Sequence, residues 1–384
     1  MSDLKKESID LHREKRGKLA IASKVPLKNR QDLSLAYTPG VGAVSEAVAA
    51  EPGLAYELTL KGNTVAIVSD GSAVLGLGNL GAMGAIPVME GKAVLFKEFA
   101  GVDAWPICLD TQDTEEIIRT VKNIAPVFGG INLEDISAPR CFEIEERLRA
   151  ELPIPVMHDD QHGTATVVLA GLINALKLRG LAKEEAKVIV NGVGAAGTAI
   201  TKILADYGFR HFTLCDSKGV LTKDRGDLNE EKLKLISYLE LKTGEYSPVT
   251  GELKQAIAGK DIFIGVSKGN LVDEAMIQSM NERPIVFALA NPTPEIMPDI
   301  AKAAGAFVIA TGRSDFPNQI NNVLAFPGIF RGALDNHIKQ FDDRMFLRAA
   351  ENLAGCVANL TPDQVLPDPF DRTIVAKIAE AIRD

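Results

Sequence analysis

The sequence has no long apolar segment and few cysteines. Its apolar runs fall short of the ~20 consecutive residues that a membrane-spanning helix requires. The 4 cysteines, Cys108, Cys141, Cys215 and Cys356, are far apart and form no CxxC pair, which argues against a disulfide framework or a zinc site. The first residues lack the apolar core of a secretory signal. These absences predict a cytoplasmic protein with reduced thiols and no membrane partner.

Basic residues are also in the minority. The sequence holds 42 Lys and Arg against 51 Asp and Glu, a net charge of −9, and an acidic chain without a basic cluster is a poor candidate for binding nucleic acid. Hydrophobic residues make up 46% and charged residues 24%, which is ordinary usage for a folded globular protein. At ~100–200 residues per domain, the 384 residues predict two domains.

Short apolar runs alternate with helical patterns along most of the chain. The strands and further short apolar runs are 64–69, 93–96, 105–109, 131–133, 187–190, 211–215, 261–265, 285–289 and 306–310. The expected helices are one within 1–30, one from 41 onward, 113–125, 138–150, 164–178 and 195–207. Such alternation predicts a two-domain α/β protein, with an N-terminal α/β domain over 1–160 and a Rossmann-like, doubly wound parallel sheet over 161–384.

The stretch Gly192-Val193-Gly194-Ala195-Ala196-Gly197 matches the G-x-G-x-x-G fingerprint of dinucleotide binding. It follows an expected strand and opens an expected helix, which is the context that the fingerprint requires. The first glycine allows a tight turn, the second lets the backbone approach the pyrophosphate, and the third lets helix and strand pack closely. The helix N-terminus would attract the phosphates. A glycine-rich turn without a ligand is the other interpretation.

Asp216 ends the next expected strand, ~20 residues past the glycines, where the fingerprint expects an acidic residue. We expect its carboxylate to accept hydrogen bonds from the adenosine ribose hydroxyls, which favours NAD. Ser217 and Lys218 follow directly and could hold a 2′-phosphate instead. The cofactor is therefore NAD or NADP.

A second match, Gly76-Leu-Gly-Asn-Leu-Gly81, also follows a strand. The residues after it, up to Pro87, do not suggest a helix that opens on the glycines, and no acidic residue ends a following strand. We interpret this stretch as a tight glycine-rich loop that lines a cleft, not as a dinucleotide site.

Two acidic groups border apolar strands. Glu134 and Asp135 follow one, and the segment His158-Asp159-Asp160-Gln161-His162 follows another. Adjacent carboxylates raise one another's pKa unless a cation neutralises them, and oxygen ligands suit Mg²⁺ or Mn²⁺. The pattern HDDQH is not HExxH and has no neighbouring cysteine, so zinc is less favoured. A solvated acidic loop is the plainer alternative.

Taken together, the motifs resemble the malic enzymes of the short bacterial type, in order, from residue 37 to about 330. They are Tyr37-Thr-Pro-Gly-Val-Gly42, Asp70-Gly71, Leu75-Gly-Leu-Gly-Asn-Leu-Gly81, Gly91-Lys92, Asn132-Leu-Glu-Asp-Ile136, His158-Asp-Asp-Gln-His-Gly-Thr-Ala165, Gly192-x-Gly-x-x-Gly197, Ala290-Asn-Pro-Thr-Pro294, Gln319-Ile-Asn-Asn-Val323 and Phe326-Pro-Gly328. The resemblance implies oxidative decarboxylation of (S)-malate to pyruvate and CO₂, with NAD⁺ or NADP⁺ reduced and Mn²⁺ or Mg²⁺ bound. Decarboxylation of oxaloacetate is implied as a further activity.

The resemblance also implies a role for each group. Lys92 is similar to the general base that takes the proton of the C2 hydroxyl, and burial together with the metal's charge would lower its pKa. Tyr37 is similar to the general acid that protonates C3 of the enol. The remaining implied roles are metal ligands at Glu134, Asp135 and Asp160, a carboxylate beside the lysine at Asp159, and contacts to malate and the nicotinamide end at Asn291, Asn321 and Asn322.

One position departs from the pattern. Larger relatives carry an arginine that clamps a substrate carboxylate where this chain has Ala73. The carboxylate would then be held by the metal, the asparagines, Lys92 or a basic residue of a neighbouring subunit. The resemblance implies a homodimer, and the charged N-terminal 30 residues are the expected place for exchange between subunits.

Two other functions compete with this interpretation. In a malolactic-type enzyme the reduced cofactor stays bound and lactate is released; such relatives are usually longer, so the chain length counts against it. In a cofactor-sensing protein of the same fold, a general acid and a general base would have no use. Tyr37, Lys92 and the acidic ligands therefore favour catalysis.

Overall fold

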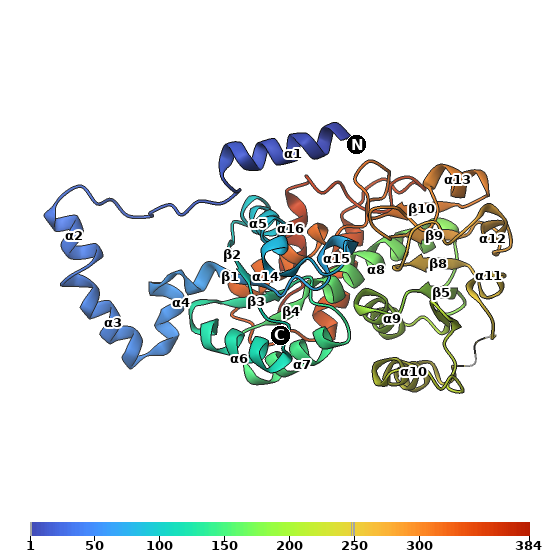
Figure 1. Cartoon of the computed structure of the whole chain (residues 1–384), viewed down its shortest axis with the longest axis horizontal. Coiled ribbons are helices and arrows are strands. Elements are labelled where there is room, and N and C mark those ends of the chain that lie inside the picture. Colours follow the sequence, from blue (N-terminus) through green and yellow to red (C-terminus); the bar gives the residue numbers. More distant parts are fainter. Residues whose placement is uncertain (1, 247, 249) are drawn as a thin grey trace.

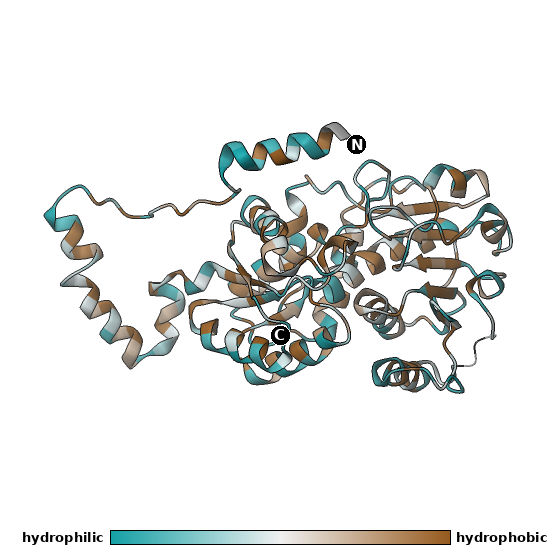
Figure 2. Ribbon diagram, in the orientation of Figure 1, coloured by the Kyte–Doolittle hydropathy of each residue, from teal (hydrophilic) through white to brown (hydrophobic). Residues whose placement is uncertain are grey.

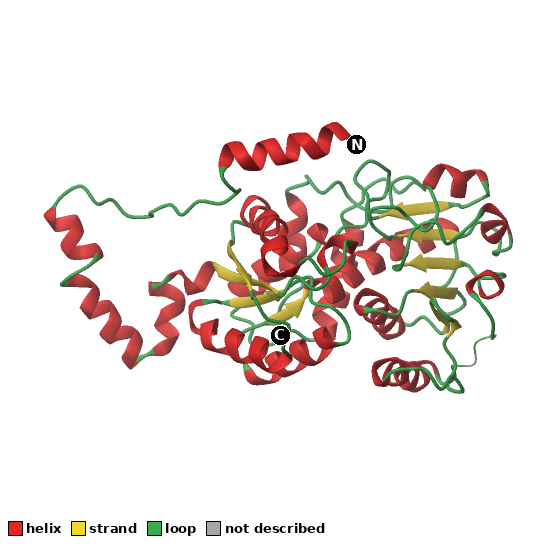
Figure 3. Ribbon diagram, viewed as in Figure 1, coloured by secondary structure: helices red, strands yellow, loops and turns green. Residues whose placement is uncertain are grey.

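Two β-sheets flanked by helices form the body of the chain (Figure 1, Figure 3). The computed structural model describes residues 2–246, 248 and 250–384. The strands are β1 (Thr64–Ser69), β2 (Asp103–Cys108), β3 (Gly130–Leu133), β4 (Val156–His158), β5 (Lys187–Asn191), β6 (His211–Asp216), β7 (Gly219–Val220), β8 (Ile262–Gly265), β9 (Ile285–Ala288) and β10 (Val308–Thr311). The helices are α1 (Ser2–Lys15), α2 (Arg30–Ala36), α3 (Gly40–Ala50), α4 (Ala55–Leu58), α5 (Gly81–Ala100), α6 (Thr114–Ile124), α7 (Arg140–Glu151), α8 (Asp159–Arg179), α9 (Ala195–Tyr207), α10 (Glu230–Thr243), α11 (Leu253–Ala256), α12 (Glu274–Gln278), α13 (Pro298–Ala303), α14 (Phe326–Asp335), α15 (Asp343–Gly355) and α16 (Thr373–Ala379).

The first sheet has four parallel strands in the order β2-β1-β3-β4. Every residue of β1 and β3 is buried, as expected for apolar strands that helices cover on both faces. The apolar run 93–96 is not a strand but part of α5, the helix that connects β1 to β2. Because the strands are parallel, the chain leaves β1, β3 and β4 at the same edge of the sheet.

The second sheet has six strands in the order β10-β9-β8-β5-β6-β7. Its pairs are parallel except for the short antiparallel β7 at one edge. The chain reverses its direction of winding between β5 and β8, which is where ligands bind in open α/β sheets. This sheet confirms the predicted Rossmann-like, doubly wound architecture.

Two helices differ from the sequence prediction. Helix α8 starts at Asp159 rather than after Gly163. Gly163 lies inside the helix, where a Cβ atom would come 1.8 Å from Asp159 Oδ1. Helix α5 starts at Gly81, so the expectation that no helix opens on the second glycine motif is wrong. Pro87 is tolerated near the start of α5, where it removes one helical hydrogen bond without ending the helix.

The C-terminal helices return to the first sheet. Helix α14 contacts α5 and β3, and the ring of Phe330 lies 5.5 Å from that of Phe96. Residues of both sheets contribute to one large apolar core. The boundary between residues 160 and 161 falls in the first turn of α8, and the division of the chain there stays a prediction.

The N-terminal segment forms an arm. Helices α2 and α3 stand away from the body of the chain, at the end of an extended segment (Figure 1). Neither helix has a buried residue, although both carry apolar side chains (Figure 2). Lys18 ties the base of the arm to α5, since its backbone N–H donates a 3.1 Å hydrogen bond to Glu90. No helix in the described part of the chain is long and apolar enough to cross a membrane.

Candidate active site

Lys92 lies within the buried stripe of α5. Four apolar residues of this stripe recur at helical spacing: Ala85, Met89, Ala93 and Phe96. Lys92 is only 6% exposed, and its ammonium forms ion pairs with Asp159 and with Glu134, whose Oε1 lies 2.5 Å from Nζ. Nζ also lies 4.5 Å from the centre of the Phe326 ring. A buried ammonium group needs partners of this kind to offset the water that it loses.

The carboxylates come together at the carboxyl edge of the first sheet. Glu134 and Asp135 follow β3 directly, whereas Asp159 and Asp160 begin α8 directly after β4. Because β3 and β4 are parallel neighbours, the two acidic pairs lie side by side. The backbone N–H of Asp135 donates a 3.0 Å hydrogen bond to Asp160 Oδ2, which links the two pairs.

Three of these carboxylates lie close enough together to bind one metal ion. Oxygens of Glu134, Asp135 and Asp160 all lie within 4.8 Å of one another. These are the three residues that the resemblance assigns as ligands. Among the residues that the structure describes, His158 and His162 are not part of this group of possible metal ligands. A set of oxygen donors favours Mg²⁺ or Mn²⁺ over zinc.

The electrostatics of the cluster fit a bound cation. Burial, and then the charge of Asp160, raise the pKa of Asp135 to about 7. Burial and the neighbouring carboxylates also raise the pKa of Glu134 well above its usual value, against the opposing charge of Lys92. Asp135 Oδ2 is buried and has no hydrogen-bond partner. A divalent cation would relieve this repulsion and satisfy that oxygen.

The same carboxylates determine the direction in which the pKa of Lys92 is shifted. Burial alone would lower the pKa of Lys92, but the charges of Asp159, Glu134 and Asp160 outweigh burial and raise it. The lowering expected from the sequence is therefore opposed by the neighbours that the structure brings to the lysine. A cation on the cluster would neutralise two of these carboxylates and restore the tendency of burial to lower the pKa.

The structure places the three predicted asparagines in two separate segments. Asn322 lies beside the first turn of α8: a Cβ atom added to Gly163 would be 3.3 Å from the Cβ atom of Asn322. Asn321 caps the short 3₁₀ helix Asn322–Leu324 through a 2.9 Å hydrogen bond from the backbone N–H of Val323. Asn291 follows β9, and its carbonyl oxygen would lie 2.7 Å from a Cβ on Gly76. The glycine-rich loop 76–81 is thus placed against the end of a strand of the second sheet, between the two sheets.

The dinucleotide fingerprint has the expected local geometry. Gly192 has φ of +106°, and a Cβ there would lie 2.7 Å from the carbonyl oxygen of Val266 at the end of β8. A Cβ on Gly197 would lie 1.8 Å from the carbonyl oxygen of Gly192, so helix α9 packs there only with glycine. A Cβ on Gly194 would meet no atom within 4 Å, which leaves room for a phosphate. Helix α9 begins at Ala195 with no side-chain cap, so its first N–H groups are available to an anion.

Asp216 is surrounded by basic residues that the sequence reasoning missed. Arg225 donates hydrogen bonds of 2.9 and 3.1 Å to its two oxygens, and Lys232 of α10 donates one of 2.6 Å to Oδ2. The backbone N–H of Lys218 donates to Oδ1 at 2.9 Å. Burial would raise the pKa of Asp216, but the hydrogen bonds from Arg225 and Lys232 lower it. In this arrangement each carboxylate oxygen of Asp216 already accepts two hydrogen bonds, and the side chains of Arg225 and Lys232 place two positive charges beside it.

Two family models match nearly the whole chain. Residues 16–149 match the malic enzyme N-terminal domain, and residues 161–383 match the malic enzyme NAD binding domain. This chain belongs to the malic enzyme family.

Similar proteins cover the chain almost from end to end. It is 52% identical over 382 residues to the bifunctional malic/malolactic enzyme of Bacillus subtilis, which covers 99% of this chain and 92% of that protein. It is 54% identical over 371 residues to the NAD-dependent malic enzyme of Geobacillus stearothermophilus, which covers 95% of this chain and 76% of that protein. The solved structure of the NAD-dependent malic enzyme of Thermotoga maritima matches with a TM-score of 0.93 and 48% identity, over 97% of this chain and 98% of that one. The similarity to the Bacillus protein overturns the argument that chain length counts against malolactic activity.

Tyr37 is the one predicted catalytic residue of this malic enzyme family member that does not join the site. It is the C-cap residue of helix α2, which lies on the N-terminal arm (Figure 1). Its side chain is 67% exposed. Lys92, by contrast, is buried in the body of the chain. Within one chain, the structure therefore brings together Lys92 and the acidic residues, with Asn322 beside the first turn of α8, but not Tyr37.

Arg140 lies next to the loop that contains Ala73. Its guanidinium forms a 2.8 Å ion pair with Asp70 and donates a 3.0 Å hydrogen bond to Ser72 Oγ. It also donates to the backbone carbonyl of Gln112 at 2.7 Å. These contacts make Arg140 a support for the loop. They leave its guanidinium engaged by the protein, so Arg140 does not simply replace the missing clamp.

Proposed function

We propose that this malic enzyme family member oxidatively decarboxylates (S)-malate to pyruvate and CO₂ and reduces NAD⁺ or NADP⁺. The observation that carries the proposal is the contact of buried Lys92 with Glu134 and Asp159, beside a cluster of three carboxylates. A module that only senses a cofactor has no need for a buried lysine held in this way. The names of the similar proteins, NAD-dependent and NADP-dependent malic enzymes, support the same activity.

Lys92 acts as the general base in this proposal. It accepts the proton of the malate C2 hydroxyl while hydride leaves C2 for the nicotinamide. Asp159 holds the lysine in position and balances the positive charge of the ammonium group after Lys92 has taken up the proton. Mn²⁺ or Mg²⁺, held by Glu134, Asp135 and Asp160, would act as a Lewis acid on the C2 oxygen and stabilise the charge that decarboxylation places there.

Tyr37 acts as the general acid, and we propose that a second copy of the chain supplies it. The support is the exposure of the arm: apolar residues of the extended segment and of α2 and α3 are open to solvent, and the largest exposed fraction is that of Ile21, at 84%. An apolar surface of this kind is typical of an interface between subunits. In a homodimer that buries these helices, each arm would bring its Tyr37 to the partner's Lys92.

The cofactor would bind along the second sheet. Backbone N–H groups of the segment Gly192-Val193-Gly194-Ala195-Ala196-Gly197 would hold the pyrophosphate. Asp216, Ser217 and Lys218 would surround the adenosine ribose. Asn291, Asn321 and Asn322 would contact malate and the nicotinamide end.

A malolactic activity is the second candidate, because a protein 52% identical to this chain carries the name malic/malolactic enzyme. In that reaction malate is converted to lactate and CO₂, and the cofactor is reduced and reoxidised without release.

Turnover with both cofactors distinguishes the candidates. Malate and Mn²⁺ are supplied with NAD⁺ or with NADP⁺, and reduced cofactor, pyruvate and lactate are all measured. Reduced cofactor with pyruvate supports the oxidative reaction, whereas lactate without net reduction supports the malolactic one. No turnover by folded protein that binds the cofactor would contradict both and favour a sensor.

A further inference from the structure

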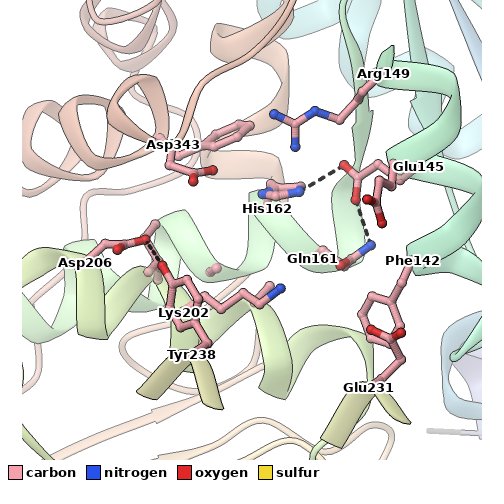
Figure 4. A pocket seen from close by; sticks show the side chains of 15 residues that line it. Phe142, Glu145, Arg149, Gln161, His162, Lys202, Asp206, Glu231, Tyr238 and Asp343 are labelled. Carbon is pink, nitrogen blue, oxygen red and sulfur yellow. Dashed lines mark hydrogen bonds and ion pairs between the residues drawn. The ribbon is translucent and has the colours of Figure 1, made fainter. Parts of the chain in front are cut away.

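The first turn of helix α8 carries a second group of polar residues, next to the two carboxylates in sequence. Gln161 and His162 follow Asp159 and Asp160 in the first turn of the helix and line a cavity of about 410 Å³ (Figure 4). Glu145 of helix α7 lines the same cavity directly beside them. The catalytic roles proposed above use none of these three residues.

Glu145 is buried, and its carboxylate accepts hydrogen bonds from residues on both sides of Asp159 and Asp160 in the sequence. It is 5% exposed. Oε1 accepts a 2.9 Å hydrogen bond from the backbone N–H of His158, and Oε2 accepts one of 2.9 Å from Gln161 Nε2. His162 Nε2 lies 2.9 Å from Oε1. The residues immediately before and after Asp159 and Asp160 are thus attached to one carboxylate.

We propose that Glu145 is a positioning residue that fixes the first turn of α8 and so sets Asp160 against Glu134 and Asp159 against Lys92. This role rests on the proposed function, since it concerns the same acidic cluster. Glu145 itself touches neither the cluster nor Lys92 and acts only through the helix.

The chemistry of a helix N-terminus explains why a carboxylate serves here. The first N–H groups of a helix have no partner within it, and a negative charge beside them is favourable. Hydrogen bonds to a charged acceptor are also stronger than neutral ones. The ring of His162 stacks on Phe346 with centroids 4.6 Å apart. This stacking holds the His162 ring in its position beside Glu145.

The neighbouring Glu146 provides a matched control. It lines the same cavity and carries the same charge, but it is exposed. Replacing it removes one negative charge from the cavity without touching the first turn of α8. An effect on metal binding that is specific to position 145 therefore cannot come from the charge of the cavity alone.

The test compares Mn²⁺ and NADH binding in Glu145→Gln, Glu145→Ala and Glu146→Gln in the full chain. Mn²⁺ binding is followed by electron paramagnetic resonance and NADH binding by fluorescence. Loss of a residue that orients ligands lowers metal affinity by about 10–100-fold. We expect a loss at the lower end of that range for Glu145→Ala and a smaller loss for Glu145→Gln, which keeps one acceptor oxygen. NADH affinity should be unchanged in both, and Glu146→Gln should bind Mn²⁺ like the wild type.

Wild-type Mn²⁺ affinity in folded Glu145→Gln or Glu145→Ala would overturn the role, as would equal losses of Mn²⁺ and NADH affinity. If Glu145→Ala does not fold, Glu145→Gln decides alone. Both binding measurements are independent of turnover, so failure of the proposed reaction would leave this result readable.

Discussion

Lys92 Nζ lies 2.5 Å from Glu134 Oε1, so the proposed base and one proposed metal ligand are in direct contact. The lysine comes from the helix after β1 and the glutamate from the end of β3. The charge of the cluster and the protonation state of the lysine are therefore linked. Changes to either group should affect proton removal from malate.

Lys92→Ala should lower the turnover number for malate oxidation by at least about 100-fold, because general base catalysis contributes ~10²–10⁴-fold. Lys92→Arg should be similarly inactive, since a guanidinium does not give up its proton near neutral pH. Lys97→Ala, on the same helix with a side chain that is 56% exposed, is the matched control. Initial rates with saturating malate and Mn²⁺ provide the comparison, and wild-type turnover by Lys92→Ala would remove the lysine from its role.

Tyr37→Phe should spare hydride transfer to a preformed keto acid and block protonation of the enol. If Tyr37 acts in the partner's site, mixing Tyr37→Phe with Lys92→Ala should restore roughly a quarter of the wild-type rate after subunit exchange, because half of the dimers are mixed and each has one intact site. Neither variant alone should form pyruvate, which is the product measured. A mixture that stays inactive although exchange is demonstrated would contradict the shared site.

Glu134→Gln and Asp160→Asn should each weaken Mn²⁺ binding, because each removes a charged ligand from the cluster. We expect the concentration of Mn²⁺ needed for half-maximal rate to rise by at least about tenfold. Glu143→Gln, an exposed change on α7, should leave it unaltered. Superimposable titration curves for wild type and Glu134→Gln would exclude Glu134 as a ligand.

Arg225→Gln and Lys232→Gln should weaken NADP⁺ binding more than NAD⁺ binding. Each change removes a positive charge from beside Asp216. Loss of Arg225 removes one hydrogen bond from each of its oxygens, and loss of Lys232 removes one from Oδ2, which opens acceptor positions for the ribose hydroxyls. The Michaelis constants for the two cofactors give the measurement, and Lys234→Gln, exposed on α10, is the control.

Asp216→Ala should have the opposite effect and cost NAD⁺ affinity more than NADP⁺ affinity. Equal losses for the two cofactors would indicate that Asp216 does not touch the ribose.

The sequence predicts most of the fold because the decisive signals are local. The glycines 192, 194 and 197 follow a buried strand, and this local context specified the turn and helix α9 correctly. The start of α8 was missed because the hydrogen bonds of its first turn go to Glu145, which lies on another helix. Long-range contacts of this kind leave no trace in local periodicity.

The residues of the candidate site could be predicted mainly from the resemblance to the malic enzymes. Lys92, Glu134 and Asp159 come from three separate elements, and only the order of parallel strands brings them together. One local signal was available and not used: Lys92 and Glu145 both occupy buried positions within the apolar stripes of their helices. A charged residue at such a position requires a buried partner, so it marks a polar site.

The most direct test of the account is the amount of pyruvate formed per reduced cofactor in a single reaction with malate and Mn²⁺. We predict equal amounts of pyruvate and reduced cofactor from the wild type and neither product from Lys92→Ala. Lactate without net reduced cofactor, or reduced cofactor that accumulates with oxaloacetate instead of pyruvate, would contradict it.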